Sequence, residues 1–107
     1  MFTRVVELVS KSGKSRELSS VINEKIVPIL KKQAGFVDEI VLVSDADSNR
    51  VLAISFWKTR EDAERYQRGQ YNNVRETLQP LLEAEPVVRT FDVHTSTGHK
   101  ITAGKAA

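Results

Sequence analysis

The stretch from Val51 to Trp57 reads VLAISFW and is apolar on both of its faces. An ordinary antiparallel strand alternates, with one face in the core and the other in water. The run IVLV at residues 40–43 repeats the two-sided pattern. A chain of 107 residues can cover one face of such a sheet with helices but has little left for the second face. We therefore expect a second copy of the chain to cover it, giving a homodimer with a ligand cleft.

The rest of the chain supplies the partners of this strand. Residues 2–9 alternate loosely between apolar and polar, as a strand does, and apolar residues recur every three or four positions in the helical segments. The expected strands are residues 2–9, 36–44, 50–58 and 87–94, and the expected helices are residues 16–33 and 60–82. The order β-α-β-β-α-β predicts an α+β, ferredoxin-like fold, with a four-stranded antiparallel sheet and both helices on one face.

Individual residues predict where each of the two helices begins, bends and ends. Ser15 is expected to cap the first helix, Pro28 to kink it, and Gly35 to stop it. The second helix starts with the capping sequence TRED at residues 59–62 and is expected to bend at Gly69.

Composition restricts the class of protein. The length predicts one domain, residues 1–95, followed by a tail at 96–107 that is mobile or contacts a partner. Without cysteine there are no disulfides and no thiolate sites, and no segment has the length of a membrane span or the pattern of a signal peptide. A cytoplasmic location is the default expectation. The net charge is only +2, and no aromatic residues interleave with the basic ones, which argues against nucleic-acid binding.

Three short motifs resemble ligand sites but are incomplete. GKS at residues 13–15 lacks the glycine of a phosphate loop, because Leu8 stands there. DADSN at residues 45–49 lacks the later glycine and glutamate of a calcium loop and is expected to be a hairpin turn. His94 and His99 are the two histidines, too few for a zinc site, so no metal is expected.

An aromatic and polar cluster remains as the candidate site. Trp57 ends a strand, Tyr66 lies in the next helix, and Tyr71 follows the expected bend. Flat side chains with polar tips suit a planar organic ligand. The alternative is that Trp57 and Tyr66 only pack the helix onto the sheet.

The segment SFWKTREDA at residues 55–63 resembles the antibiotic-biosynthesis monooxygenase family. PIL at 28–30, Gly35-Phe36 and LQPLL at 78–82 extend the resemblance over roughly residues 2–94. The resemblance implies a dimeric α+β barrel formed by pairing two sheets. It also implies a cofactor-independent monooxygenase, with no flavin or metal, in which a deprotonated small aromatic or quinol substrate passes an electron to O₂.

Individual positions carry the resemblance further. Trp57 matches the family's tryptophan, which implies a cleft wall. Tyr66 and Tyr71 stand where histidine or an aromatic residue is common. Ala53 replaces the substrate-holding asparagine of the anthrone-oxidising members, and Glu76 replaces the iron-binding histidine of a haem-degrading branch.

The resulting site hypothesis has two parts. The acid–base candidates are Tyr66, Tyr71, Glu76 and His94. The substrate-binding candidates are Trp57, Arg4, Ser55, Asn73 and Arg75, with either arginine stabilising an anion. Two alternatives stay open: an isomerase on the same scaffold, and a non-catalytic ligand-binding or interaction dimer.

Overall fold

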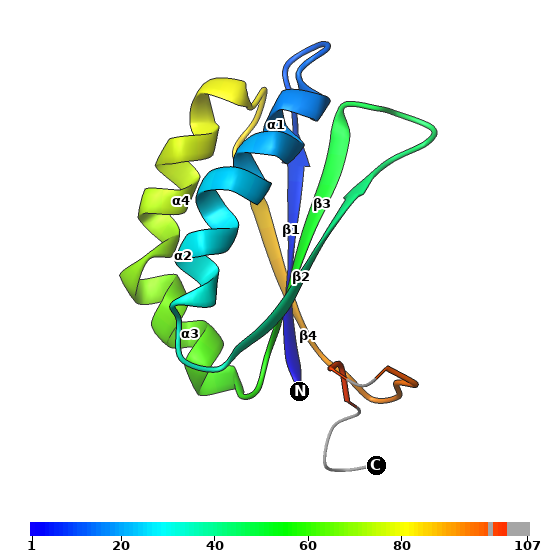
Figure 1. Cartoon of the computed structure of the whole chain (residues 1–107). Coiled ribbons are helices and arrows are strands. Elements are labelled where there is room, and N and C mark those ends of the chain that lie inside the picture. The colour runs from blue at the N-terminus through cyan, green and yellow to red at the C-terminus, as the bar shows by residue number, and fades with distance from the viewer. Residues whose placement is uncertain (99, 103–107) are drawn as a thin grey trace.

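Four strands form one antiparallel sheet in the computed structural model, which describes residues 1–98 and 100–102. The strands are β1 (Phe2–Val9), β2 (Phe36–Val43), β3 (Arg50–Trp57) and β4 (Val87–Asp92). Their order across the sheet is β2-β3-β1-β4 (Figure 1). The predicted ferredoxin-like sheet is therefore confirmed.

All of the described helices lie against one face of this sheet, as predicted (Figure 1). They are α1 (Ser15–Val21), the π-helical η1 (Ile22–Ile26), α2 (Val27–Lys31), α3 (Arg60–Gly69), α4 (Tyr71–Leu78) and the 3₁₀-helical η2 (Gln79–Leu81). The first three are continuous and fill the segment predicted as one helix. The second predicted helix breaks between α3 and α4, directly after Gly69, where the bend was expected.

The π turn explains how one face of the first helix stays in the core. Leu18, Ile22, Ile26 and Leu30 are spaced by four residues and are all buried. A straight α-helix has 3.6 residues per turn, so a spacing of four drifts around its axis. The wider π turn offsets this drift around the axis. In it, the amide of Val27 donates its hydrogen bond to the carbonyl of Ile22. Pro28, which lacks an amide hydrogen, follows directly and accounts for the irregularity expected there.

Two predicted ends differ from the structure. Ser15 does not cap α1: the helix begins at this residue, and Lys14 occupies the N-cap position without a side-chain hydrogen bond. Strand β4 ends at Asp92 rather than at His94. Asp92 pairs with Phe2, the first residue of β1, so the strand pairing ends there; beyond it the amide of Val93 donates one backbone hydrogen bond to the carbonyl of Met1. The cap at Thr59 is confirmed, since its hydroxyl accepts a hydrogen bond from the amide of Asp62 at 3.1 Å.

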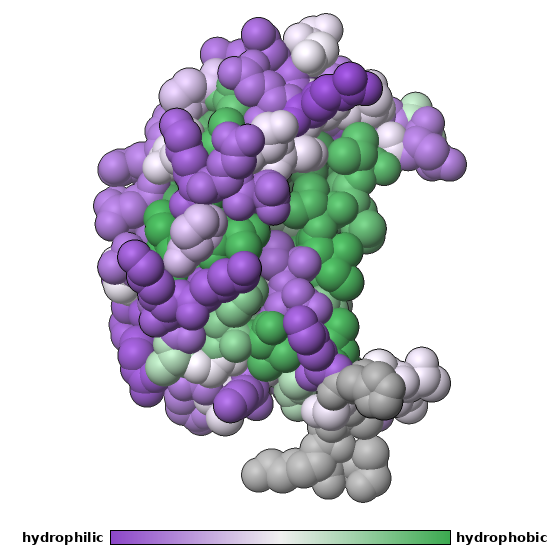
Figure 2. Space-filling model, viewed as in Figure 1, coloured by the Kyte–Doolittle hydropathy of each residue, from purple (hydrophilic) through white to green (hydrophobic). Residues whose placement is uncertain are grey.

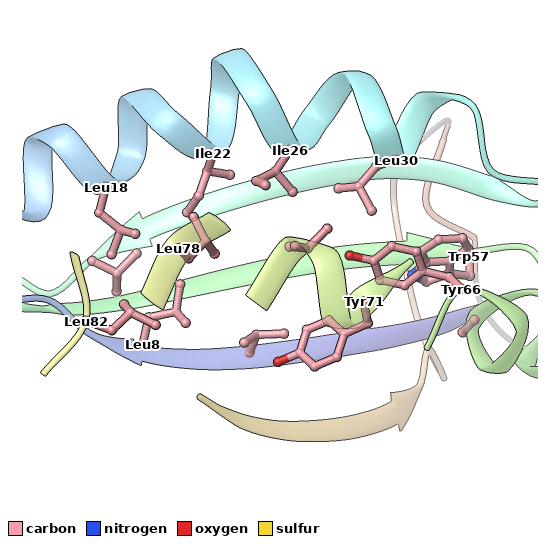
Figure 3. Packing of buried hydrophobic residues seen from close by; sticks show 14 of the residues in the cluster. Leu8, Leu18, Ile22, Ile26, Leu30, Trp57, Tyr66, Tyr71, Leu78 and Leu82 are labelled. Atoms are coloured by element: carbon pink, nitrogen blue, oxygen red, sulfur yellow. The ribbon is translucent and has the colours of Figure 1, made fainter. Parts of the chain in front are cut away.

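The core lies between the sheet and the helices (Figure 3). Leu18, Ile22, Ile26 and Leu30 point from the first helix toward the strands. The aromatic side chains of Trp57, Tyr66 and Tyr71 gather at one end of this layer, and Leu8 and Leu82 lie at the other. The functional candidates are thus concentrated at the aromatic end.

The sheet face away from the helices is largely apolar, and no described helix covers it; it also carries the ion pair between Arg89 and Glu7. It carries the large side chains of Ile40, Leu42, Val87 and Phe91, which are 38%, 46%, 45% and 50% exposed. Figure 2 shows hydrophobic surface on the side of the molecule away from the helices. We call these four residues the outer apolar face. The predicted tail is described only at residues 96–98 and 100–102, without helix or strand; His99 and residues 103–107 lie outside the described residues.

Candidate functional site

One polar row crosses the face of the sheet that the helices cover. Arg4 of β1 pairs with Ser55 of β3, and Ser55 pairs with Glu39 of β2. The next row, formed by Val6, Ala53 and Val41, is apolar. Because residues paired across strands point to the same side, the row brings a cation, a hydroxyl and a carboxyl group under the helices.

Arg4 is the most unusual member of this row because its charge is buried. The residue is 3% exposed, and its guanidinium lies 5.0 Å from the ring centroid of Tyr66 and 4.7 Å from that of Tyr71. It donates a hydrogen bond to the side-chain carbonyl of Gln67. Within residues 1–98 and 100–102 it forms no ion pair. Burial lowers the pKa of Arg4, but an arginine stays charged in proteins. The two aromatic faces and one amide are therefore its immediate support.

Glu39 is the second charged member of the row and is also poorly satisfied. Its Oε1 atom is buried and finds no hydrogen-bond partner among the residues that the structure describes. Burial raises the pKa of Glu39 to about 8, although Arg4 acts in the opposite direction and Asp38 adds a smaller increase. This carboxyl group therefore titrates close to neutral pH, as groups that exchange protons in enzymes often do.

The aromatic side chains form a continuous cluster beside the row. Trp57 and Tyr66 stack with centroids 5.1 Å apart, and Tyr71 meets Tyr66 edge-on at 6.2 Å (Figure 3). The indole of Trp57 donates a hydrogen bond to the hydroxyl of Ser55 at 2.9 Å, so this serine serves as the hydrogen-bond acceptor of the buried indole. Burial raises the pKa of Tyr66 and of Tyr71. Both phenols keep their protons at neutral pH and can act as hydrogen-bond donors.

A narrow cavity lies between the polar row and the helices. Its volume is about 30 Å³, measured as the space open to the centre of a water molecule. That is room for water but not for an aromatic ring, so side chains at the cavity must move to admit one. Apolar residues of the helices form its opposite wall. Its polar lining consists of Arg4, Glu39, Ser55, Tyr66, Tyr71 and Arg75.

The structure separates the predicted site residues into three groups. Five of them line the cavity: Arg4, Ser55, Tyr66, Tyr71 and Arg75. Trp57 is fully buried behind Tyr66 and supports it instead of forming a wall of the cavity. The other three lie on the exposed surface: Asn73, Glu76 and His94.

Glu39 and Gln67 belong to the site but are absent from the sequence-based candidates. Glu39 lies in a strand whose sequence is apolar on both faces, so parity alone did not say which face the helices would cover. The sequence did contain one indication, a charged residue within an apolar strand segment, because charged side chains are seldom buried without a partner or a function. A bulge between Phe36 and Asp38 also shifts the pairing of β2, which sequence alternation does not reveal.

The described residues were also searched for metal-binding clusters and membrane-spanning helices. Over residues 1–98 and 100–102, no group of three histidine, aspartate or glutamate side chains is placed to hold a metal ion. No helix in the same part of the chain is long and apolar enough to cross a membrane.

Comparison with known proteins gives a family match. The model of the family described as antibiotic biosynthesis monooxygenase matches residues 1–73. A search among curated proteins found no match.

Several solved structures share the fold. SnoaB, a cofactor-independent oxygenase from Streptomyces nogalater solved as a mutant, is 20% identical with a TM-score of 0.75, covering 90% of this chain and 95% of its own. A monooxygenase from the gene ActVA-Orf6 of Streptomyces coelicolor, in complex with nanaomycin D, is 17% identical with a TM-score of 0.73, covering 84% of each chain. A conserved protein from Methanosarcina mazei is 19% identical with a TM-score of 0.69, covering 85% of this chain and 91% of its own. At these identities the likeness concerns the fold.

Proposed function

Since the chain belongs to the antibiotic biosynthesis monooxygenase family, we propose that it is a cofactor-independent monooxygenase. Its substrate is a small aromatic compound of the anthrone or quinol type, and its oxidant is O₂. The observation that carries the proposal is the buried Arg4 beside the cavity, held between two tyrosine rings without a carboxylate partner in the described chain. A buried unpaired cation is costly, and a substrate oxyanion would compensate it.

The proposed reaction needs an electron-rich substrate anion. The anion passes one electron to O₂, and the resulting substrate radical and superoxide combine to form a carbon–oxygen bond. Protonation of this peroxide, loss of the remaining proton on the same carbon and cleavage of the O–O bond give a carbonyl group and water. The chain's own task is to bind the substrate, stabilise its anion with Arg4, and present phenol donors from Tyr66 and Tyr71 to its oxygen atoms.

The experiment is O₂ consumption by the pure, chelator-treated protein with a panel of anthrones and hydroquinones. We expect uptake well above the buffer rate in the wild type and in Arg68→Met, which removes an exposed arginine of α3. Arg4→Met is expected to lose at least about tenfold in kcat/KM, because one charged hydrogen-bonding group is removed from the anion. Trp57→Ala is also expected to lose activity, because Tyr66 loses its stacking partner.

One observation favours a second candidate, a non-catalytic ligand-binding dimer. The side chains of Arg4, Tyr66 and Tyr71 already fill most of the space beside the row, and Trp57 is fully buried. Absence of O₂ uptake by the wild type across the whole panel would favour this candidate and contradict the monooxygenase.

The same proposal includes a homodimer. The outer apolar face is the surface that a second copy would cover, which agrees with the sheet pairing implied by the family resemblance. Exposed apolar patches of this kind mark protein interfaces. The helices lie on the opposite side of the sheet (Figure 1), and the cavity lies between them and the sheet.

A further inference from the structure

We infer that Glu39 accepts the proton of a phenolic or enolisable substrate while Arg4 holds the oxyanion that remains. The two side chains then act as the acid–base centre of the cavity. This inference deepens the proposed function and rests on it for the identity of the reaction, but it makes a separate statement about binding and protons.

Geometry places the two groups on either side of one position in the cavity. Arg4 and Glu39 both pair with Ser55, from opposite sides, so their backbones are separated by two strand spacings, or about 10 Å. Both side chains line the same cavity, yet they form no ion pair. The Oε1 atom of Glu39, buried and without a partner in the described chain, is the free acceptor. A small polar group between the two would contact both.

Charge balance explains why the two groups suit proton transfer. The free cavity with ionised Glu39 holds one positive and one negative charge. When a neutral phenol gives its proton to Glu39, Arg4 gains the phenolate as its counter-ion and the net charge is unchanged. A transfer that creates no net charge avoids the large cost of a buried uncompensated ion.

The other groups that face Glu39 do not replace it as a base. Tyr66 on α3 and Tyr71 on α4 keep their protons, because burial raises the pKa of both. Arg75 on α4 lines the same cavity and is a cation, and Asp38 on β2 adds only a minor increase to the pKa of Glu39. The helix that covers the other side contributes apolar residues: Ile22, Ile26 and Leu30.

The proton steps balance for an anthrone-type CH₂ group. Glu39 takes the first proton, the substrate anion combines with O₂, and the protonated Glu39 returns that proton to the peroxide anion. Glu39 then removes the second proton from the same carbon while the O–O bond breaks and hydroxide leaves. The hydroxide collects this proton from Glu39. The products are a carbonyl group, water and the original carboxylate.

Binding of 4-nitrophenolate at pH 9 tests the pair without any oxidation. With a pKa of about 8, Glu39 is mostly ionised there in the free protein. Placing a phenolate beside it should return a proton to it. Calorimetry in two buffers of different ionisation enthalpy should show that the wild type takes up close to one proton per phenolate bound. Glu39→Gln should take up none, and Glu24→Gln, which alters an exposed glutamate of η1, should match the wild type.

Three results would overturn the inference. They are failure of the wild type to bind the phenolate at millimolar concentration, binding without proton uptake, and uptake that persists in Glu39→Gln. Infrared spectroscopy gives a second test: the free wild type should show a carboxylic acid band at pH 6 that disappears above pH 8, and Glu39→Gln should lack it. A wild-type spectrum without that band at pH 6 would also overturn the inference.

The outcomes separate this inference from the proposed oxidation. Proton uptake by a wild type that consumes no O₂ would support the acid–base pair and contradict the monooxygenase. O₂ consumption without proton uptake would support the monooxygenase and contradict the acid–base pair.

Discussion

Arg4 and Glu39 are two charged side chains on the helix-covered face of the sheet, where Ser55 lies between them and the next row is apolar. Burial disfavours the charged form of each, and the same burial strengthens their effect on any ligand that enters. Trp57 and Ser55 hold the neighbouring aromatic ring in place. The indole supports the ring of Tyr66, and the serine hydroxyl satisfies the indole, so the aromatic stack has a fixed position.

The raised pKa of Glu39 predicts a specific dependence of stability on pH. Between the ordinary value of 4.5 and about 8, the folded chain keeps a proton that the unfolded chain has released. This group therefore makes the free energy of unfolding fall as pH rises, by roughly 1 kcal/mol per pH unit. Glu39→Gln removes that slope.

Thermal unfolding from pH 4 to 9 measures the effect. The melting temperature of Glu39→Gln should exceed that of the wild type at pH 8 and converge with it near pH 4. Curves that run parallel over the whole range would show that Glu39 titrates alike in the folded and unfolded chains.

Helix ends and turns set the position of the site within the fold. The break after Gly69 lets α3 and α4 point Tyr66 and Tyr71 toward the same guanidinium. The junction before β2 is equally constrained. Gly35 has a φ of +80°, and a Cβ atom there would lie 2.0 Å from a carboxylate oxygen of Asp62, which belongs to the capped first turn of α3.

Two glycine substitutions separate these constraints. Gly35→Ala should lower the free energy of unfolding by about 2 kcal/mol or more, because it combines a left-handed backbone with a clash. Gly69→Ala should raise it by about 0.5–1 kcal/mol, because this glycine is helical and has open space around it. Urea denaturation of both variants measures the difference. Equal effects of the two substitutions would contradict the account.

The whole molecule has its helices on one face of the sheet and a bare apolar face on the other (Figures 1 and 2). Such a two-layer arrangement leaves the second face to another molecule or to water. The cavity lies under the helices, so a partner on the outer apolar face would not block it.

The proposed homodimer predicts a change of mass with one substitution. Leu42→Glu places a charge on the outer apolar face and should convert a dimer into a monomer, because burying an unpaired carboxylate is costly. Ser20→Glu adds the same charge on the exposed side of α1 and should leave the dimer intact. Sedimentation at micromolar concentration measures both. A monomeric wild type would contradict the dimer at the outset.

Local sequence patterns were enough to predict the order of the elements, the hairpin, the cap at Thr59, the break after Gly69 and the two-sided apolar strands. These features depend on neighbours within a few residues, where spacing and turn chemistry dominate. Several cavity residues, among them Arg4, Tyr66 and Tyr71, were also candidates from their type and position. The folded chain was needed to show that Glu39 shares a row with Arg4, that Trp57 lies behind the cavity, and that His94 lies beyond the sheet. Those facts depend on strand register and on which sheet face the helices cover, and packing between distant segments sets both.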